Sequence, residues 1–466
     1  MTNTTMKPTF ELPDSLWKAT AEPLDVFDCQ QHDIDTDLLI IGAGYTGLST
    51  ALHAIGAVGD DDNNDETIIG KSTQSGPIKD IVVIDQAQPG WGCSGRNGGQ
   101  IIPHWKAPVN QLKKLYPGQQ FDPFIRMQDQ SAKLVFGLIE QFKIDCHSIN
   151  TGNLIATRGK KGYQYLRDWV DFQKNYGADV ELLDAKATAD MIGSNAYDAC
   201  LYDHRGGSIQ PLSYAQGLAQ ACLQQGVQIF KNTQAVSITA DGKDAKKGWL
   251  VKTDKGTIKC NRLVIGTNGY TDKLWPGLAQ TIVPVASMIA ATKPLPEEIA
   301  SKILPSRRPV AEYAGIPAYY RIDESNRLVF GSRGNLLGNI GSTGSGELVG
   351  MLDTRHLKKQ AIKLFPSLAS VDWEYDWAGY VAITTPMRPL LTKLGNNAFA
   401  GLGYNGRGIT TATSMGRQLA RALKGQSTSV AIEAPKPIPF HRCYPIGVAS
   451  RVLSGHIRDY FTARMS

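Results

Sequence analysis

A glycine-rich stretch near the start of the chain has the residue types and spacing of a diphosphate site. It reads GAGYTG over residues 42–47 and follows the apolar run at 38–41. Glycines at these spacings permit a tight turn, let a diphosphate approach the backbone and allow a helix to pack closely on a strand. The free N–H groups and the dipole at the start of that helix also favour bound phosphate. The stretch predicts a dinucleotide-binding unit, and an ordinary strand–helix turn is the alternative interpretation.

Asp85 ends the next apolar run, IVVID, where such units place an acidic residue that binds a ribose hydroxyl. It lies 38 residues after Gly47 (85 − 47 = 38) rather than about 20. The polar, acidic stretch 56–80 accounts for the excess, and we expect it to be a surface insertion. Its GKST segment (70–73) is not a triphosphate loop, because no strand precedes it and the required glycine is replaced by Asp65. For Asp85 itself, a plain turn residue is the alternative.

Two further glycine-rich loops favour a flavin over a nicotinamide cofactor. They read GWGCSGRNGGQ over residues 90–100 and GLGYNGRGIT over residues 401–410. A nicotinamide dinucleotide needs little beyond the first strand–turn–helix, the acid and a later pocket. A flavin dinucleotide also needs backbone that approaches its diphosphate and its three-ring system closely, and glycine allows that approach. In the first loop, Arg96 would act as a donor or cation beside the diphosphate or the ring.

Length and composition limit the class of protein. A chain of 466 residues exceeds what one core usually organises, so two domains are expected. No apolar run approaches the roughly 20 residues that span a bilayer, and the N-terminus lacks a secretory pattern, so we expect a cytoplasmic protein without an integral membrane segment. The net charge of +6, without a basic block, gives no nucleic-acid signature. The seven cysteines and eight histidines show no CxxC, HxxxH or HExxH spacing, so neither a disulfide framework nor a metal site is expected.

Six stretches, taken in order, resemble the segments of FAD-dependent amine oxidoreductases of the D-amino-acid-oxidase superfamily, a group that includes glycine and sarcosine oxidases. They are DLLIIGAGYTGLSTALHA, VVIDQAQPGWGCSGRNGGQ, GGSIQPLSYAQGLAQACLQQGVQIFKNTQAVSI, NRLVIGTNGYT, DWAGYVAITTPMRPLL and GLGYNGRGITTATSMGRQLA. Within the superfamily, the 90–100 loop, DWAGYVAIT and GYNGRG resemble the gamma-glutamylputrescine oxidoreductases most. The likeness runs from about residue 15 to the C-terminus.

This resemblance implies an α/β fold in which a Rossmann-like FAD-binding domain (GR2-type) is interleaved with an α+β substrate domain built on a mixed or antiparallel sheet. The domains would comprise 36–108, 206–283 and 376–430 for FAD, 109–205 and 284–375 for substrate, and a C-terminal tail with a helix at 431–466. Strand, turn and helix patterns of the dinucleotide type at the start, middle and end of the chain are consistent with this interleaving.

The resemblance also implies FAD, bound non-covalently. Some relatives attach FAD through a cysteine near the segment that here reads YVAITTPMRP, which has none. The residues that would bind FAD are Gly42, Gly44, Tyr45, Thr46 and Gly47; Asp85 and Gln86; Ser94, Gly95, Arg96, Asn97, Gly98 and Gly99; Val236, Thr267, Asn268 and Gly269; and Gly406, Arg407, Gly408 and Ile409. The last group would hold the pyrimidine edge of the flavin, where N–H groups or a cation stabilise the charge that develops on reduction.

The substrate-pocket candidates that follow from the resemblance are His104, Trp105, Tyr380, Arg388 and Tyr404. His104 could instead cap a turn, and Trp105 could belong to the core. Tyr380 could pack within a strand, and Arg388 could pair with a surface carboxylate. No catalytic acid or base is assigned, because the flavin carries the chemistry.

The chain departs from the family pattern at three places. Asp85 replaces the more common glutamate, a change that a ribose contact tolerates. Cys93 replaces the usual alanine and is either a packed small residue or a redox-sensitive thiol. Ala382 and the following MRPLLTKL differ from the acidic residue and spacing expected there, which leaves the substrate open.

Three functions follow from these observations. The first is oxidation of a C–N bond in gamma-glutamylputrescine or a related polyamine derivative, with hydride transfer to the flavin and hydrolysis of the imine. The second is oxidation of glycine, sarcosine or a D-amino acid by the same chemistry. The third is a non-catalytic flavin-binding scaffold. The sequence decides neither between O2 and another electron acceptor nor the oligomeric state.

Overall fold

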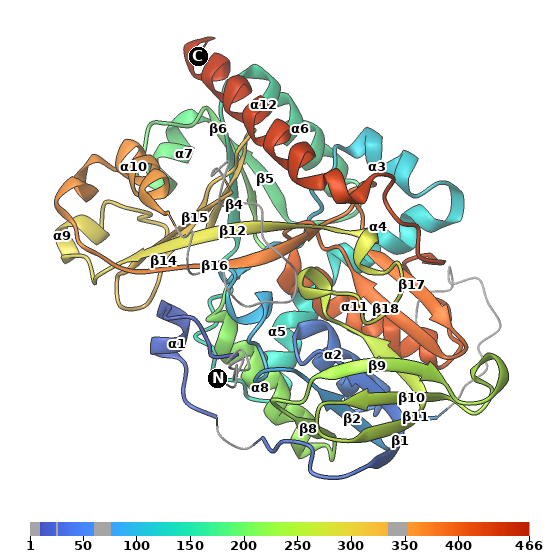
Figure 1. Cartoon of the computed structure of the whole chain (residues 1–466). Helices are drawn as coiled ribbons and strands as arrows, with labels where there is room; N and C mark the ends of the chain where they lie inside the picture. Colours follow the sequence, from blue (N-terminus) through green and yellow to red (C-terminus); the bar gives the residue numbers. More distant parts are fainter. Residues whose placement is uncertain (1–9, 25–26, 60–75, 334–352, 466) are drawn as a thin grey trace.

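The computed structural model describes residues 10–24, 27–59, 76–333 and 353–465 (Figure 1). Its strands form two large sheets, which occupy the lower right and the upper left of Figure 1, and one small two-stranded sheet. The expected insertion at 56–80 falls largely on residues 60–75, so most of it, including the GKST segment, lies outside the described residues.

The first large sheet gathers strands from three distant parts of the chain. In the described residues it has nine strands: β1 (Ile34–Ile41), β2 (Ile81–Ile84), β8 (Gln228–Phe230), β9 (Ala235–Ala240), β10 (Trp249–Thr253), β11 (Thr257–Ile265), β17 (Leu390–Gly395), β18 (Ala398–Leu402) and β19 (Ile432–Glu433). β1 lies between β2 and β11, parallel to both, and β11 pairs in parallel with β18. The four residues at 38–41 are buried, as a parallel strand covered on both faces requires.

Helices cover this sheet and bring the first and last glycine-rich stretches together. α2 (Tyr45–Ala54) is buried along its whole length and packs on α11 (Gly408–Leu423), with α8 (Pro211–Gln224) beside it. Both α2 and α11 follow directly on a strand and a glycine turn, as the sequence predicts. The close packing of α2 on α11 therefore places residues 42–47 near residues 403–408.

The second large sheet is mixed. It runs β16-β12-β15-β14-β13-β4-β6-β5, and every neighbouring pair is antiparallel except β13 and β4. Its strands are β4 (Asn153–Thr157), β5 (Val180–Leu183), β6 (Ala199–Asp203), β12 (Val283–Thr292), β13 (Val310–Tyr313), β14 (Tyr319–Ile322), β15 (Leu328–Ser332) and β16 (Trp373–Ile383). A parallel-type sheet with helices beside a mixed sheet confirms the predicted α/β fold class.

β16 does not follow the expected division at residue 376. That boundary falls inside β16, which pairs along its length with β12 of the mixed sheet, from Val283 opposite Ile383 to Thr292 opposite Trp373. Continuous pairing of two long antiparallel strands holds both in one sheet. The FAD-binding part therefore resumes after residue 383, in the division that we now propose.

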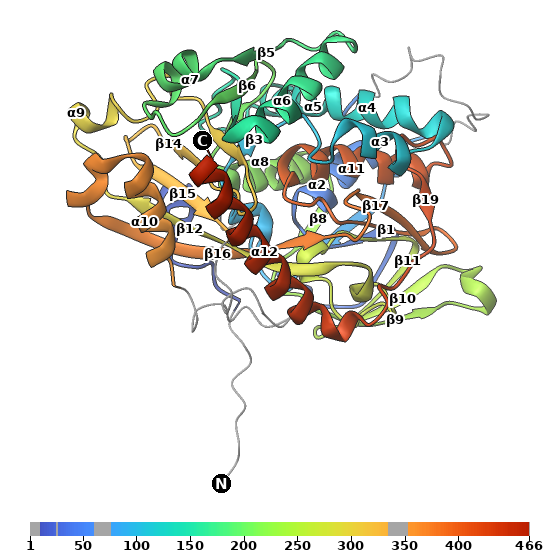
Figure 2. The ribbon, with the colours of Figure 1, turned by 90° about the horizontal axis from the view of Figure 1, so that it is seen from above.

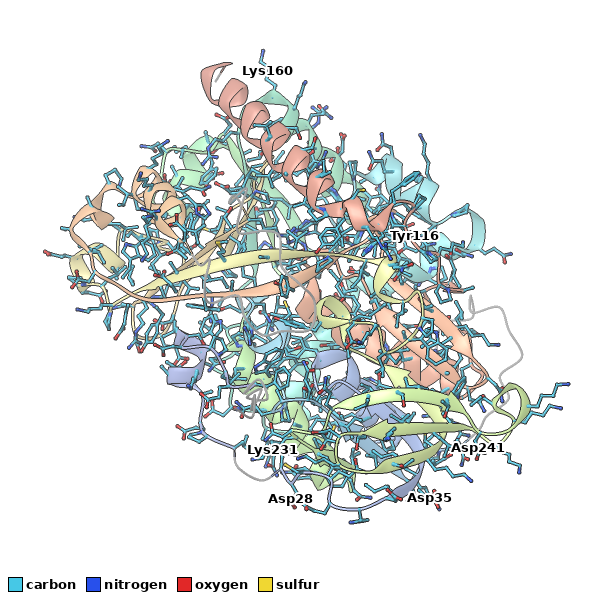
Figure 3. All side chains as sticks on the ribbon, in the orientation of Figure 1. Asp28, Asp35, Tyr116, Lys160, Lys231 and Asp241 are labelled. Atoms are coloured by element: carbon cyan, nitrogen blue, oxygen red, sulfur yellow. The ribbon has the colours of Figure 1, made fainter. Side chains whose placement is uncertain are left out.

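The remaining elements surround the two sheets. They are α1 (Leu16–Thr20), β3 (Gln100–Ile101), α3 (Val109–Leu115), α4 (Phe121–Asp129), α5 (Ser131–Gln141), α6 (Gly159–Lys174), α7 (Ala185–Ile192), β7 (Gly207–Ser208), α9 (Glu297–Ala300), α10 (Arg355–Leu364) and α12 (Tyr444–Met465). α12 is a long helix on the outside of the molecule (Figures 1 and 2). In Figure 3, exposed Asp35 marks the amino end of β1 and exposed Lys160 the opposite end of the molecule, with buried Tyr116 at a height between them.

Candidate FAD and substrate site

One large cavity collects most of the residues singled out from the sequence. Its volume is about 1200 Å³, more than the ~300–1,000 Å³ typical of a pocket for one small ligand. Residues that directly follow β1, β2, β11 and β18 line it, among them Gly42, Asp85 and Thr267. Because these strands are parallel, their carboxyl ends meet at one edge of the sheet, where α/β proteins bind ligands.

The GAGYTG turn has the backbone geometry that its glycines predict. Gly42 has φ +109°, and a Cβ there would come within 3.1 Å of the carbonyl carbon of Gly266. A Cβ on Gly47 would collide with the carbonyl oxygen of Gly42, so helix and strand pack at backbone contact. Gly44, the N-cap of α2, has no side chain to satisfy the helix N–H groups. Gly42, Gly44, Tyr45 and Thr46 line the cavity, whereas Gly47 stays behind it.

Asp85 supports the turn and faces the cavity. Its Oδ2 accepts a hydrogen bond from Ala43 N at 2.8 Å, and its Oδ1 accepts one from Ala87 N at 3.0 Å. Burial raises the pKa of its carboxyl to about 6, although both hydrogen bonds favour the charged form. Gln86 also lines the cavity. The placement is compatible with a ribose contact.

The expected adenine contact at Val236 is displaced along the chain. Val236 lies on β9, is 56% exposed and does not line the cavity. Thr233, Gln234 and Ala235, which precede it, do line the cavity. Asn232 adopts φ +50°, and this kink ends the apolar run that the sequence presents as one strand. We therefore correct the expectation from Val236 to residues 233–235.

The 90–100 loop lies against the start of α2. Ser94 Oγ accepts a hydrogen bond from Tyr45 N at 3.1 Å, and Tyr45 Oη donates to Ser94 O at 2.6 Å. Asn97 Nδ2 donates to Ser94 O at 2.8 Å. Ser94, Arg96, Asn97 and Gly98 line the cavity; Gly95 does not, and its missing Cβ leaves room for the carbonyl oxygen of Gly90. The loop is held by its own hydrogen bonds, so it presents a fixed backbone to the cavity.

Arg96 holds this loop in place. Its guanidinium is 4.6 Å from the Trp91 ring centroid, and its Nε donates to Trp91 O at 2.7 Å. Nη1 donates to Ala378 O at 3.4 Å, across to β16, and the residue is only 5% exposed. Although Arg96 contributes to the cavity wall, these contacts direct its N–H groups to protein carbonyls. Its position favours a positioning role over the direct cofactor contact predicted from the sequence.

The later loops meet the first turn. Asn268, with φ +43°, accepts a hydrogen bond from Gly403 N at 2.9 Å through its Oδ1, which joins the ends of β11 and β18. The Tyr404 hydroxyl lies 2.7 Å from Thr46 Oγ1. The cavity is also lined by Thr267, Asn268, Gly406, Arg407, Gly408 and Ile409, but not by Gly99 or Gly269. A Cβ on Gly269 would approach the Tyr380 carbonyl at 2.7 Å, so that glycine serves backbone packing.

Three cations from different elements line one part of the cavity. They are Lys106, Arg333 and Arg407. A Cβ added to Gly406 would lie 3.1 Å from Lys106 Nζ and would collide with Arg333 Nη2, so both side chains reach the 406 turn. In the part of the chain that the structure describes, no carboxylate pairs with Lys106 or Arg407. Lys106 and Arg333 have no motif around them that could have revealed this cluster.

The charges of this cluster oppose one another. Burial, together with Arg333 and Arg407, holds the pKa of Lys106 well below its usual range. Burial lowers the pKa of Arg407 to about 10 despite the nearby Tyr165. Such a cluster is stabilised when an anion enters it.

His104, predicted for the substrate pocket, does line the cavity next to this cluster. Burial and then Arg407 hold its pKa well below the usual range, so the ring is neutral near pH 7. Its ring packs on Trp169 with centroids 5.4 Å apart, and its Nδ1 has no hydrogen-bond partner among the described residues. Tyr404 also lines the cavity. His104 therefore contributes its ring to the cavity wall, while its Nδ1 is buried without a partner among the described residues.

Three predicted pocket residues are not part of the cavity lining. Trp105 is buried and donates from Nε1 to Met387 O at 2.7 Å. Tyr380 packs on Tyr270 with centroids 5.6 Å apart. Arg388 Nη2 pairs with Glu433 Oε1 at 2.5 Å. Each of the three side chains contacts protein groups. Trp105 belongs to the core, Tyr380 packs from its strand and Arg388 pairs with a carboxylate, which are the alternatives given for them above.

Cys93 lines the cavity, but as a protonated thiol. Burial raises its pKa to about 11, although Arg96 and Arg333 favour the thiolate. Because the thiolate is the reactive form, we do not expect redox reactivity near neutral pH.

The arrangement fits FAD. The cavity passes from the start of α2, where a diphosphate would bind, along the fixed 90–100 backbone to the 406–409 turn. Its size accommodates a dinucleotide and a second, smaller molecule. Among the described residues, no group of histidine, cysteine and acidic side chains could hold a metal ion. None of the helices traced in the described ranges is both long and apolar enough to cross a membrane.

Comparison with known proteins agrees with this geometry. Residues 37–422 match the family described as FAD dependent oxidoreductase (DAO). The chain is 28% identical over 448 residues to the gamma-glutamylputrescine oxidoreductase of Escherichia coli K12, with 95% of both chains covered. It is 22% identical to the sarcosine oxidase subunit beta of Rhodobacter capsulatus over 85% of this chain and 86% of that one. Its fold is similar to the crystal structure of glycine oxidase from Geobacillus kaustophilus, with a TM-score of 0.66 at 18% identity over 85% of this chain and 97% of that one.

Proposed function

The chain belongs to the DAO family of FAD-dependent oxidoreductases, and from this premise we propose that it oxidises a C–N bond in an amine that also carries a carboxylate. Gamma-glutamylputrescine or a related polyamine derivative is the substrate that we propose. The enzyme uses FAD, which when bound accepts the hydride from the carbon beside the amine nitrogen. The imine product then hydrolyses to an aldehyde and an amine or ammonia.

The cation cluster is the observation that carries this proposal. Lys106, Arg333 and Arg407 meet at the Gly406 turn, where the reacting end of FAD would lie. A carboxylate of the substrate would form charge-assisted hydrogen bonds with Lys106 and Arg407, which pair with no carboxylate among the described residues. A simple diamine such as putrescine carries no such group and would be repelled by the cluster.

The same positive field would prepare the substrate amine for oxidation. The amine must be neutral, yet alkylammonium groups titrate near ~10.4, as lysine does. Neighbouring cations and an apolar environment both lower the pKa of an ammonium group, as they lower that of Lys106. The neutral ring of His104, which lies in the wall beside the cluster, would add no further charge there. The side chains would thus bind and orient the substrate and favour its neutral amine, whose proton would leave to solvent.

We further propose that FAD is bound without a covalent bond. The segment 380–389 contains no cysteine, and burial keeps the Cys93 thiol protonated. Denaturation with acid should leave the yellow colour in the supernatant. Colour that stays in the precipitated protein would show a covalent link.

An amino acid such as glycine, sarcosine or a D-amino acid is the second candidate substrate. It also carries a carboxylate beside an amine, and the similarity to a sarcosine oxidase subunit favours it. The two candidates differ in length, because the carboxylate of gamma-glutamylputrescine is far from the oxidised carbon.

Anaerobic bleaching of the flavin absorbance tests these proposals. We expect fast bleaching by gamma-glutamylputrescine, and bleaching by putrescine slower by at least about 100-fold, since a lost charged contact is worth ~2–3 kcal/mol. Sarcosine, whose carboxylate lies directly beside its amine, should also bleach the flavin more slowly. Faster bleaching by sarcosine would establish the second candidate, and faster bleaching by putrescine would contradict the role of the cluster. Peroxide formation in air would then identify O2 as the electron acceptor.

A further inference from the structure

We propose that α12 forms one wall of the substrate cavity and selects the substrate through its apolar inner face. This inference rests on the proposed function for the identity of the substrate, but not for the position of the helix. The family match ends at residue 422, before α12 begins. The wall therefore comes from a part of the chain outside the matched family region.

The residues of α12 that line the cavity repeat with helical spacing. They are Tyr444, Gly447, Val448, Arg451 and Val452. Positions i, i+3, i+4, i+7 and i+8 lie on one face of an α-helix. Ile446 and Leu453 belong to the opposite face and are 72% and 54% exposed. One face of α12 is thus turned to the cavity and the other to solvent.

The chain leading into α12 is fixed to the FAD-binding sheet. β19 pairs in parallel with β17, and Arg388 holds Glu433 in an ion pair. Further along, Ile438 N donates to Gln280 O at 2.9 Å, and the His441 ring contacts Ile282 O at 2.7 Å. Because Gln280 and Ile282 directly precede β12, the helix starts at a defined place between the two sheets.

The helix is also fixed further along, on the mixed-sheet side. A Cβ on Gly455 would lie 2.8 Å from Ile316 Cδ1 and 3.2 Å from Gly315 O, so the helix backbone lies directly on this loop. Residues 313–318 of the loop line the cavity themselves. α12 also runs beside α6 (Figure 1). Anchors on both sheets hold the inner face of α12 in place across the cavity.

The chemistry of this wall complements the cation cluster. Val448 is half-buried and offers branched apolar surface, and Val452 packs beside it with 6% of its surface exposed. Arg451 is the one charged side chain among the described lining residues of this face. An aliphatic chain that loses water against such surface gains about 0.8 kcal/mol for each CH₂ group buried. The four-carbon aliphatic chain of gamma-glutamylputrescine would be stabilised by this contact. Glycine and sarcosine have no aliphatic chain that could make it. The wall would thus favour an amine with an extended aliphatic segment.

A pair of double variants on the two faces of the same helix tests the proposal in the FAD-loaded enzyme. The inner-face variant is Val448→Ala with Val452→Ala, and its matched control is Ile446→Ala with Leu453→Ala. We expect the inner-face variant to raise KM for the amine that best bleaches the wild type by about tenfold, because it removes apolar contact from part of the substrate chain. The control should keep the wild-type KM.

A second readout does not depend on the substrate. Acrylamide quenching of the bound-flavin fluorescence should increase in the inner-face variant and stay at the wild-type level in the control. Equal KM and equal quenching in both variants would overturn the proposal. Failure of the wild type to bleach with any amine would instead count against the proposed function, and the quenching comparison would still test the wall.

A bulky replacement provides a second test if the alanine variant does not fold. Val448→Trp should narrow the cavity and lower kcat/KM at least about tenfold, while bleaching by dithionite, which needs no substrate wall, stays unchanged. Ile446→Trp is its control. A Val448→Trp enzyme with wild-type kcat/KM would contradict the proposed role of α12.

Discussion

Lys106 illustrates how a single residue can serve binding at the expense of stability. Its side chain is half-buried in the cavity wall beside two guanidinium groups, and no carboxylate among the described residues pairs with it. Burial of an unpaired charge costs free energy, and each unit of pKa depression corresponds to ~1.4 kcal/mol. Residues kept despite such a cost are frequently functional.

We expect Lys106→Met to stabilise the protein while impairing substrate binding. Without ligand, the free energy of unfolding at pH 7 should rise by on the order of 1 kcal/mol, because a strained cation is lost. KM for a carboxylate-bearing amine should rise at least about tenfold, since a hydrogen bond to a charged group is worth ~1.5–3 kcal/mol. Urea unfolding and steady-state kinetics measure the two effects. Lys113→Met, at an exposed position on α3, is the control and should change neither quantity.

Because of Asp85, the stability of the apoprotein should fall as the pH rises. Its folded pKa of about 6 lies above its ordinary value of 3.8. Between these values the folded state holds a proton that the unfolded state has lost, so the free energy of unfolding falls as the pH rises. Relative to Asp85→Asn, the wild type should lose about 2–3 kcal/mol between pH 4 and pH 7. Denaturation at several pH values measures this difference, and a constant difference would contradict the assignment.

At the scale of the elements, two glycines in helices have opposite roles. Gly47 lies in α2, where a Cβ would collide with the Gly42 carbonyl oxygen. Gly137 lies in α5, where a Cβ would meet nothing within 4 Å. The first permits the close packing of helix and strand that forms the diphosphate turn. The second has no such function.

Gly47→Ala should therefore be harmful, whereas Gly137→Ala should be favourable. Gly47→Ala should push α2 away from β1 and give protein that purifies without FAD, which its absorbance near 450 nm would reveal. Gly137→Ala should keep FAD and gain ~0.5–1 kcal/mol of stability from the better helix propensity of alanine. Yellow Gly47→Ala protein would show that the turn tolerates displacement.

The glycine loops were predictable because their signal is local. The strand–turn–helix around Gly42 and the loop around Gly98 can each be recognised from a few consecutive residues. Both segments line the cavity in the structure. Lys106 and Arg333 were not predictable, because only the packing of β3, β15 and α11 brings them to the same turn. The resemblance makes Arg388 a pocket candidate, and no local pattern reveals its partner, because Glu433 lies 45 residues away in the sequence.

At the scale of the whole molecule, Arg388 and Glu433 join the C-terminal segment to the FAD-binding sheet. The guanidinium and carboxylate are 13% and 28% exposed, so solvent screens the pair only in part. Arg388 also lies 6.0 Å from the Tyr116 ring centroid. This pair supports the strand β19 from which the chain continues to α12.

We expect Arg388→Ala to act on stability rather than on substrate choice. A double-mutant cycle with Glu433→Gln should give a coupling of about 1 kcal/mol in the free energy of unfolding. KM should change by the same factor for gamma-glutamylputrescine and for a simple amine. A rise in KM for the carboxylate-bearing amine alone would instead indicate that Arg388 contacts the substrate.

The interleaving of the FAD-binding sheet sets the order in which a newly made chain can acquire its cofactor. β1 is among the first strands to leave the ribosome, but its neighbour β11 is made more than 200 residues later, and β18 follows after residue 397. Pairing between such distant segments is slow and must wait for the last of them. The residues of the turn that would bind the diphosphate are thus synthesised long before the neighbouring strands that complete the site. Loading with FAD is therefore a late event, close to the release of the finished chain.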